Sequence, residues 1–151
     1  MESQYIEKLH KEKKIILKSY EPGQIRSLLE KVERNIKVTS AISLTEESAD
    51  VIFTQMYESV RQLGDVLWWL LGYEPQYHET SLEALKKAEF LTPEQKVTLQ
   101  SLNRFKDIRH DSHYRGFEVS YRQAQEIKDF WNNVGVAVLK HINLTSPHSS
   151  R

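Results

Sequence analysis

The sequence contains no cysteine, and this absence excludes disulfide bonds, thiol catalysis and thiolate metal sites. Glycine and proline are scarce, with five and four in 151 residues, and they stand at intervals that suit helices. The longest apolar run, VLWWLLG, is far too short to span a membrane, so no membrane partner is expected. The N-terminus MESQYIEKLHKEKKII carries charges throughout and lacks the apolar core of a signal peptide, which predicts a cytoplasmic protein.

The sequence also lacks an excess of positive or negative charge. Lys and Arg together number 21, as do Asp and Glu, so the formal net charge is zero. This balance argues against a protein that coats a polyanion with its whole surface, but it permits a local basic patch. With 39% hydrophobic and 28% charged residues, the chain has the composition of a folded protein, and its length fits one domain with a single core.

Apolar residues at three- and four-residue spacing are the main feature of the sequence. The longest such stripe, over about 46–72, is wide enough to touch several partners, which is typical of a central helix. Further helices are expected over 24–42, 81–91, 93–114 and 120–142. No segment alternates as a strand or contains a hairpin turn. The sequence therefore predicts an all-α fold, an antiparallel up-down bundle of five or six helices.

Three parts of the chain are distinguished by their composition. We expect a charged N-terminal helix over 1–20, the helical bundle over 21–143 and a disordered tail over 144–151. Within the bundle, Thr92 and Gln95 have the form of a capping box and mark the start of a helix.

One stretch, RFKDIRHDSHYRG at 104–116, gathers polar and charged side chains near a helix end. On a helix, Arg109 and His113 are four residues apart and share a face. His110 is three residues from His113 and four residues from Tyr114. One helical edge is therefore predicted to present a guanidinium, two imidazoles and a phenol close together.

These residue types suit the cleavage of RNA without a metal ion. A base must take the proton of the 2′-hydroxyl, an acid must protonate the leaving 5′-oxygen, and a cation must stabilise the charged phosphorane. Histidine titrates near neutral pH, and arginine binds phosphate oxygens through paired hydrogen bonds. The pattern also fits a solvated helix end, where cations complement the helix dipole. A metal site of His110, Asp111 and His113 is disfavoured, because Asp111 lies on a different face and no HExxH pattern is present.

The order of features along the chain resembles the HEPN superfamily of small helical bundles. The segment KVERNIKVTSAI is similar to the family's ERN-like segment, and ESADVIFTQMYESVRQLGDVLWWLLGYEPQYHETSLEAL is similar to its YES-containing helix with a following LLGY-P loop and histidine. RFKDIRHDSHYRGFEVSYRQAQEIKDFW then occupies the place of the family's Arg-x4–6-His motif and last helix. The resemblance covers roughly residues 24–142.

This resemblance implies a HEPN-like bundle that forms a homodimer, with the motif at the dimer interface and facing a cleft. Many members are metal-independent endoribonucleases. A common role is the toxin of a prokaryotic toxin–antitoxin pair whose partner is a small nucleotidyltransferase, and other members are non-catalytic binding or scaffold domains. The implied partners are therefore RNA and a nucleotidyltransferase antitoxin, with no cofactor and no metal.

The motif fits this chain in two ways. Arg104 and His110, with five residues between them, satisfy the spacing literally. Arg109 is the better structural match, because the polar residue His110 follows it directly. In that alignment Tyr114 stands five positions on, where histidine is usual, and His113 falls one residue early.

In the nuclease that the resemblance implies, Arg109 holds the scissile phosphate and His110 and His113 share the acid–base work. Tyr114 orients one of these histidines or binds the base. The remaining cations of the stretch position the RNA backbone, and they are Arg104, Lys106 and Arg115.

The competing interpretation is a non-catalytic interaction module. In it the same polar cluster forms a hydrogen-bond network across a dimer, or binds a nucleotide or the partner nucleotidyltransferase. The loop YEPQYHETS, with Tyr77 and His78, is then part of the binding surface.

Overall fold

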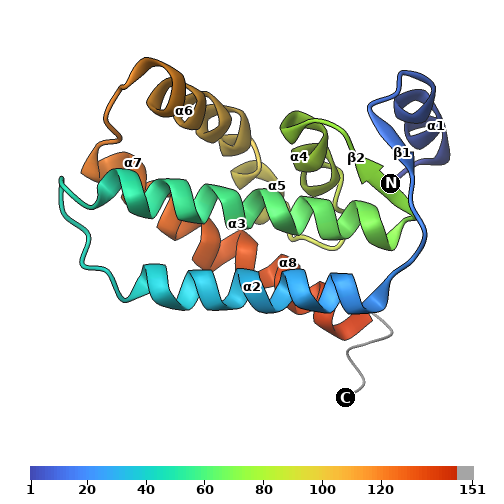
Figure 1. The fold of residues 1–151 in the computed structure, drawn as a ribbon, viewed down its shortest axis with the longest axis horizontal. Helices are drawn as coiled ribbons and strands as arrows, with labels where there is room; N and C mark the ends of the chain where they lie inside the picture. The colour runs from blue at the N-terminus through green and yellow to red at the C-terminus, as the bar shows by residue number, and fades with distance from the viewer. Residues whose placement is uncertain (146–151) are drawn as a thin grey trace.

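Helices make up most of the protein in the computed structural model, which describes residues 1–145 (Figure 1). In chain order the helices are α1 (Ser3–Lys11), α2 (Pro22–Ser40), α3 (Ala49–Leu70), α4 (His78–Lys86), α5 (Pro93–Thr98), α6 (Ser101–Arg115), α7 (Tyr121–Phe130), the π-helical turn η1 (Trp131–Gly135) and α8 (Val136–Thr145). Two strands, β1 (Ile15–Leu17) and β2 (Tyr73–Pro75), form one small sheet. The predicted all-α fold class is confirmed.

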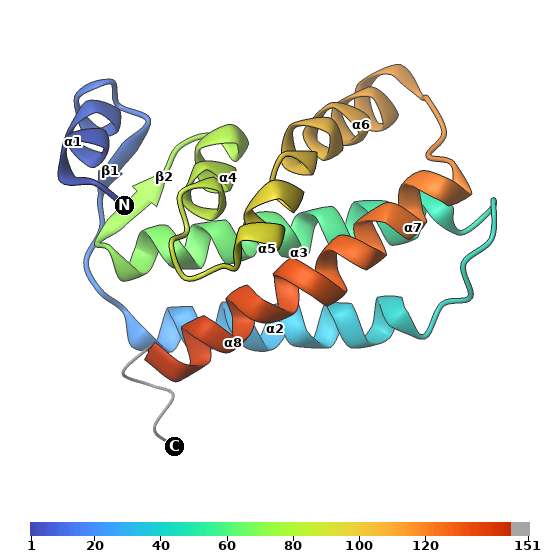
Figure 2. The same cartoon turned by 180° about the vertical axis from the view of Figure 1, so that it is seen from behind.

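Helix α3 is the central element of the bundle. Helix α2 packs along one side of it, and α4, α6 and the α7–η1–α8 segment pack around the rest (Figures 1 and 2). Because α3 touches partners on several sides, its apolar surface is much wider than that of an ordinary surface helix. Its buried apolar side chains include Ile52, Phe53, Met56, Val60, Leu63 and Val66.

Local capping signals set the ends of several helices. Thr92 and Gln95 form the predicted capping box at the start of α5, and Ser120 and Gln123 form a second one at α7. Helix α6 ends at Gly116, whose φ of 69° is a left-handed conformation that glycine adopts without strain.

The N-terminal segment differs from the single helix predicted over 1–20. Helix α1 ends at Lys11, and Lys13, with φ of 61°, turns the chain into strand β1. Strand β1 pairs antiparallel with β2, so that Ile15 lies opposite Pro75. The two strands are far apart in sequence and three residues long, and neither produces a local alternation or a hairpin signal.

The N-terminal segment packs on the bundle. Leu9 and Ile15 are buried against Trp68 of α3 and Ala84 of α4. The hydroxyl of Tyr5 donates a hydrogen bond of 2.7 Å to the Glu83 carboxylate of α4. No helix within residues 1–145 combines the length and apolar character needed to cross a bilayer.

Three helices of the C-terminal half differ from the predictions, and the first is the helix expected over 81–91, which runs over His78–Lys86 as α4. The helix expected over 93–114 is divided into α5 and α6. Between them the backbone forms a 3₁₀-type turn, in which the Gln100 amide donates a hydrogen bond of 3.2 Å to the Val97 carbonyl. The helix expected over 120–142 contains η1 and runs on to Thr145. Of the tail predicted over 144–151, residues 146–151 lie outside the described part of the chain.

Candidate functional site

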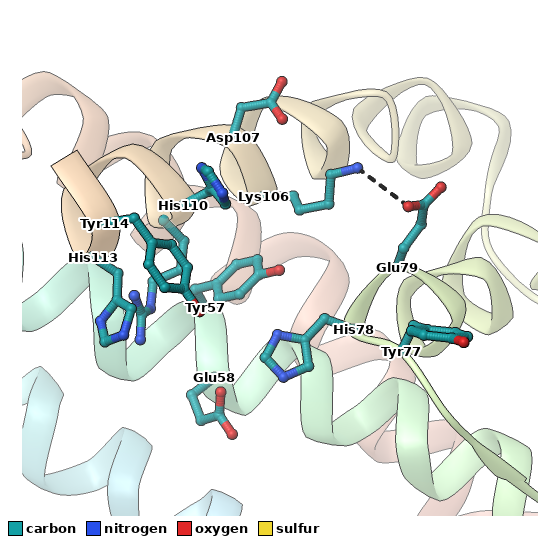
Figure 3. Close-up of a pocket in the computed structure, with 11 residues that line it drawn as sticks. Tyr57, Glu58, Tyr77, His78, Glu79, Lys106, Asp107, His110, His113 and Tyr114 are labelled. Carbon is teal, nitrogen blue, oxygen red and sulfur yellow. Dashed lines mark ion pairs between the residues drawn. The ribbon is translucent and has the colours of Figure 1, made fainter. Parts of the chain in front are cut away.

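The polar stretch of α6 lines a cleft of about 610 Å³ (Figure 3). Helix α3 contributes the floor, and the opposite wall is formed by the first residues of α4 and the tyrosine before them. The lining side chains are Tyr57 and Glu58 from α3, Tyr77, His78 and Glu79 at the start of α4, and Lys106, Asp107, Arg109, His110, His113 and Tyr114 from α6.

Aromatic packing fixes the position of α6 over this cleft. Phe105 of α6 is fully buried, and its ring meets Phe53 of α3 edge to face at a centroid distance of 5.9 Å. It meets Phe130 of α7 in the same way at 5.4 Å. Edge-to-face pairs at these distances are favourable beyond their buried area. Because Phe105 faces inward, Arg109 one turn later and His113 two turns later lie on the side of α6 that faces the core.

The cleft gathers five of the seven side chains predicted for the site, and two lie elsewhere. Arg109, His110, His113 and Tyr114 all line it, as does Lys106. The other two arginines of the stretch are outside: Arg104 pairs with Glu126 of α7, and the Arg115 Nε lies 3.8 Å from the Asp111 carboxylate at the end of α6.

Arg109 has no partner of its own within residues 1–145. Its side chain is half-buried at the cleft and takes part in no hydrogen bond or ion pair there. Lys106 differs, because its Nζ lies 3.8 Å from the Glu79 carboxylate across the cleft mouth (Figure 3). The Arg109 guanidinium therefore keeps its hydrogen-bond donors available for a ligand that carries negative charge.

The two α6 histidines are grouped around one tyrosine. The Tyr114 ring lies 4.9 Å from the His110 ring and 4.6 Å from the His113 ring, measured between centroids. The Nδ1 atom of His110 is 3.7 Å from the Asp111 carboxylate. All three rings are exposed, so their polar atoms can reach a molecule in the cleft.

His78 brings a third imidazole to the cleft from the opposite wall (Figure 3). Burial lowers its pKa below the ordinary value of 6.5, and the positive charges of Arg61 and Arg109 lower it further, while Glu58 and Asp65 act in the opposite direction. The ring is therefore neutral at pH 7 and can accept a proton. Sequence reasoning placed His78 only on a loop surface, because its separation from α6 gives no local spacing signal.

Tyr57 and Glu58 form the floor of the cleft. Tyr57 is almost completely buried, and burial raises the pKa of its hydroxyl to about 12, so the group stays protonated and can donate. Burial opposes ionisation of Glu58, but the hydrogen bond and charge of Arg61 outweigh it, and the pKa of Glu58 is lowered. Sequence reasoning assigned neither residue to the site, because Tyr57 is buried with the apolar side chains of the central helix and Glu58 lies far in sequence from the α6 stretch.

A polar network inside α3 holds this floor in place. Arg61 donates from Nε to Glu58 at 3.2 Å and from Nη1 to Asp65 at 3.0 Å. Asp65 also accepts a hydrogen bond of 2.5 Å from the Ser81 hydroxyl of α4. Burial raises the pKa of Asp65, although Ser81 and Arg61 both favour its charged form. Arg61 is thus engaged within the protein, unlike Arg109.

Close approach between α3 and α4 fixes the wall that carries His78. A Cβ added at Gly64 would lie 2.8 Å from the Ser81 carbonyl carbon, which is closer than real Cβ contacts. The indole Nε1 of Trp68 donates a hydrogen bond of 2.7 Å to the Thr80 carbonyl. Glycine at position 64 is therefore required for α4 to lie this close, and the start of α4 is held to α3 at two neighbouring residues.

Within residues 1–145 no three His, Asp or Glu side chains converge in a geometry that would hold a metal ion. Besides the carboxylates of Glu58, Glu79 and Asp107, the cleft offers a free guanidinium, imidazoles on two walls and a protonated phenol. Guanidinium groups are suited to binding anions, and imidazoles are suited to transferring protons.

Comparisons with known proteins found no match for this chain among protein-family models, curated proteins or solved structures.

Proposed function

We propose that the cleft binds the backbone of single-stranded RNA and cleaves it without a metal ion. The observation that carries this proposal is the free Arg109 guanidinium in a cleft that has histidines on two walls. A free arginine favours a phosphate, because its planar donors match two phosphate oxygens. Histidines on opposite sides of a bound phosphate meet the need for one base and one acid.

The proposed reaction is an internal transesterification. A base takes the proton of the 2′-hydroxyl, and the 2′-oxygen forms a bond to phosphorus. The bond from phosphorus to the 5′-oxygen breaks, and an acid protonates that oxygen. One product ends in a 2′,3′-cyclic phosphate and the other begins with a 5′-hydroxyl, so no water and no external reactant are consumed.

Separate residues of the cleft act as base, acid and charge-stabilising group in this reaction. His78, which is neutral at pH 7 because its pKa is lowered by burial and by Arg61, is the base. His110 and His113 supply the acid, and Arg109 neutralises the phosphorane. The protonated Tyr57 hydroxyl donates to a phosphate oxygen from the floor.

The wider biological proposal is a HEPN-type homodimer that acts as the toxin of a toxin–antitoxin pair, with a nucleotidyltransferase as its partner. The all-α fold and the place of the Arg–His cluster on the helix before the C-terminal one support it. The proposed dimer has twice the chain mass of 17.8 kDa. Light scattering on the eluting protein measures this mass directly, and a value of one chain would contradict it.

The proposed activity is tested with purified protein and a mixed RNA pool in buffer that contains EDTA. Wild type is expected to cut, and Arg109→Ala is expected to lose about 100-fold to 1000-fold in rate, as for other stabilisers of a charged transition state. Arg34→Ala is the matched control, because it removes an exposed arginine of α2 that has no ion pair within residues 1–145. Equal rates for all three proteins would overturn the assignment of Arg109.

A second candidate is the non-catalytic interaction module. The observation that favours it is a set of exposed aromatic side chains, with Tyr77 at 61% and Tyr114 at 72% exposure in the cleft and Phe117 at 59% beyond the end of α6. Such residues are enriched where proteins bind one another. This function predicts that wild type leaves RNA intact, and that Tyr114→Ala and Phe117→Ala abolish binding to a nucleotidyltransferase partner.

A further inference from the structure

A second hollow is formed in part by α4 and α6, the helices that also line the cleft. It measures about 390 Å³ and lies between the end of α4, helix α5 and the start of α6. We call it the lysine groove, and its lining side chains include Lys86, Lys87, Lys96, Gln100 and Asn103. The one carboxylate in its lining, Glu89, lies 3.8 Å from the α-amino group of Met1.

Two cations of the lysine groove are free of ion pairs within residues 1–145, namely Lys87 and Lys96. Lys86 is engaged, because its Nζ donates at 3.2 Å to Glu83 and at 2.6 Å to the Asn103 side-chain oxygen. The amide nitrogen of Asn103 remains a donor. The Lys87 Nζ lies 4.7 Å from the centroid of the Tyr5 ring, a cation–π contact that does not neutralise its charge. The groove therefore presents two positive charges without carboxylate partners in the described residues and a neutral donor, which suits a phosphate group.

Helices α4 and α6 join the groove to the cleft. Lys106 meets Glu79 across the two helices at the cleft end, and Asn103 meets Lys86 at the groove end. Asn103 and Lys106 are three residues apart and share one face of α6. From Asn103 to His110 the helix rises about 10 Å, at 1.5 Å per residue. A single strand bound at Arg109 therefore reaches the groove within a few nucleotides.

We propose that the lysine groove is a second phosphate-binding subsite that holds the RNA strand on one side of the scissile bond. This inference rests on the proposed function, and it specifies the substrate as a strand long enough to follow α6 from cleft to groove. Lys87 and Lys96 position the backbone by charge and do not take part in the chemical step.

The test uses the double variant Lys87→Ala/Lys96→Ala and the control Lys31→Ala/Lys37→Ala. The control removes two exposed lysines of α2, which lies on the far side of α3 from α6 (Figures 1 and 2). Binding of a 12-nucleotide 2′-O-methyl RNA, which cannot be cleaved by the proposed reaction, is measured by fluorescence anisotropy from 50 to 200 mM salt.

The logarithm of the binding constant falls linearly with the logarithm of the salt concentration. For a single strand, loss of two phosphate contacts reduces the steepness of this dependence, the salt slope, by about 1.4. Wild type is therefore expected to lose about sevenfold more affinity across this salt range than the groove variant, and the control is expected to match wild type. A groove variant with wild-type affinity and salt slope would overturn the subsite.

Inorganic pyrophosphate provides a probe that does not depend on RNA. Its addition is expected to shift the side-chain amide NMR signals of Gln100 and Asn103 in wild type and in the control, but not in the groove variant. Equal shifts in all three proteins would overturn the subsite. Pyrophosphate binding in the groove of a wild-type protein that binds no RNA would overturn the RNA assignment together with the proposed function, and would leave an anion site.

Discussion

The Ser81 hydroxyl of α4 donates a hydrogen bond of 2.5 Å to the Asp65 carboxylate of α3. Asp65 also pairs with Arg61, and Arg61 holds Glu58 at the cleft floor. These contacts form a continuous polar network from Ser81 of α4, the helix that carries His78, to the Glu58 carboxylate at the cleft floor. The relative position of α3 and α4 therefore determines whether His78 faces the histidines of α6 across the cleft.

Ser81→Ala is expected to lower the free energy of unfolding by about 1–3 kcal/mol, because it leaves the mostly buried Asp65 without one of its donors. The measurement is the denaturant midpoint at constant slope. Ser27→Ala, which removes an exposed hydroxyl of α2, is expected to leave the midpoint unchanged or raise it slightly, because alanine favours a helix more than serine does. An equal midpoint for Ser81→Ala and wild type would show that the contact with Asp65 has no net effect on stability.

Gly64→Ala is expected to destabilise the protein by about 1–3 kcal/mol, because its Cβ would press on the Ser81 backbone and separate α3 from α4. Gly23→Ala is the control, since a Cβ there meets nothing within 4 Å and the residue lies in helix α2. That control is expected to be neutral or to stabilise by up to about 1 kcal/mol. Thermal unfolding of both variants measures the difference, and a fully stable Gly64→Ala would contradict the close approach.

The sequence was sufficient to predict the fold class and the polar edge of α6 that lines the candidate cleft. Helical periodicity identified the central helix, and the spacing from Arg109 to Tyr114 identified a shared polar edge, because both signals are local. The opposite wall was not predictable in the same way. His78 and Tyr57 reach the cleft only through the packing of α4 and α6 on α3, and the pairing of Ile15 with Pro75 is equally non-local.

Arg104 and Arg115 lie outside the cleft, although the sequence of the α6 stretch predicted them for the site. Arg104 belongs to the same stretch as Arg109, but it faces α7 and pairs there with Glu126. The partner of Arg104 comes from another helix, so the sequence around Arg104 does not predict this pair, whereas the contact between Arg115 and Asp111 lies within α6 at four-residue spacing.

The imidazole of His78 is expected to titrate below pH 6.5, because burial and the charge of Arg61 lower its pKa. The unfolded chain then binds more protons in that window, so the contribution of His78 to stability is present above pH 6.5 and is lost as the pH falls. Arg61→Gln is expected to raise the pKa of His78 toward 6.5. NMR titration of the ring protons checks both statements, and an unchanged midpoint in Arg61→Gln would refute the influence of Arg61.

Tyr57→Phe is expected to reduce RNA cleavage by about tenfold to a hundredfold, the effect of losing one hydrogen bond to a charged group. Stability is expected to stay the same, because the hydroxyl has no hydrogen-bond partner within residues 1–145 and the ring still fills its place beside Phe53. Tyr20→Phe, at an exposed position before α2, is the control. A Tyr57→Phe protein with full activity would remove the hydroxyl from the proposed mechanism.

The ends of the cleavage products test the proposed chemistry most directly. A defined RNA oligonucleotide and a copy with one 2′-deoxy nucleotide at the cut position are incubated with wild type in EDTA and analysed by mass spectrometry. We expect a 2′,3′-cyclic phosphate and a 5′-hydroxyl from the first, and no cut at the deoxy position of the second. Products that carry a 5′-phosphate, cleavage at the deoxy position, or intact RNA in both samples would contradict a metal-free site built on Arg109 and the facing histidines.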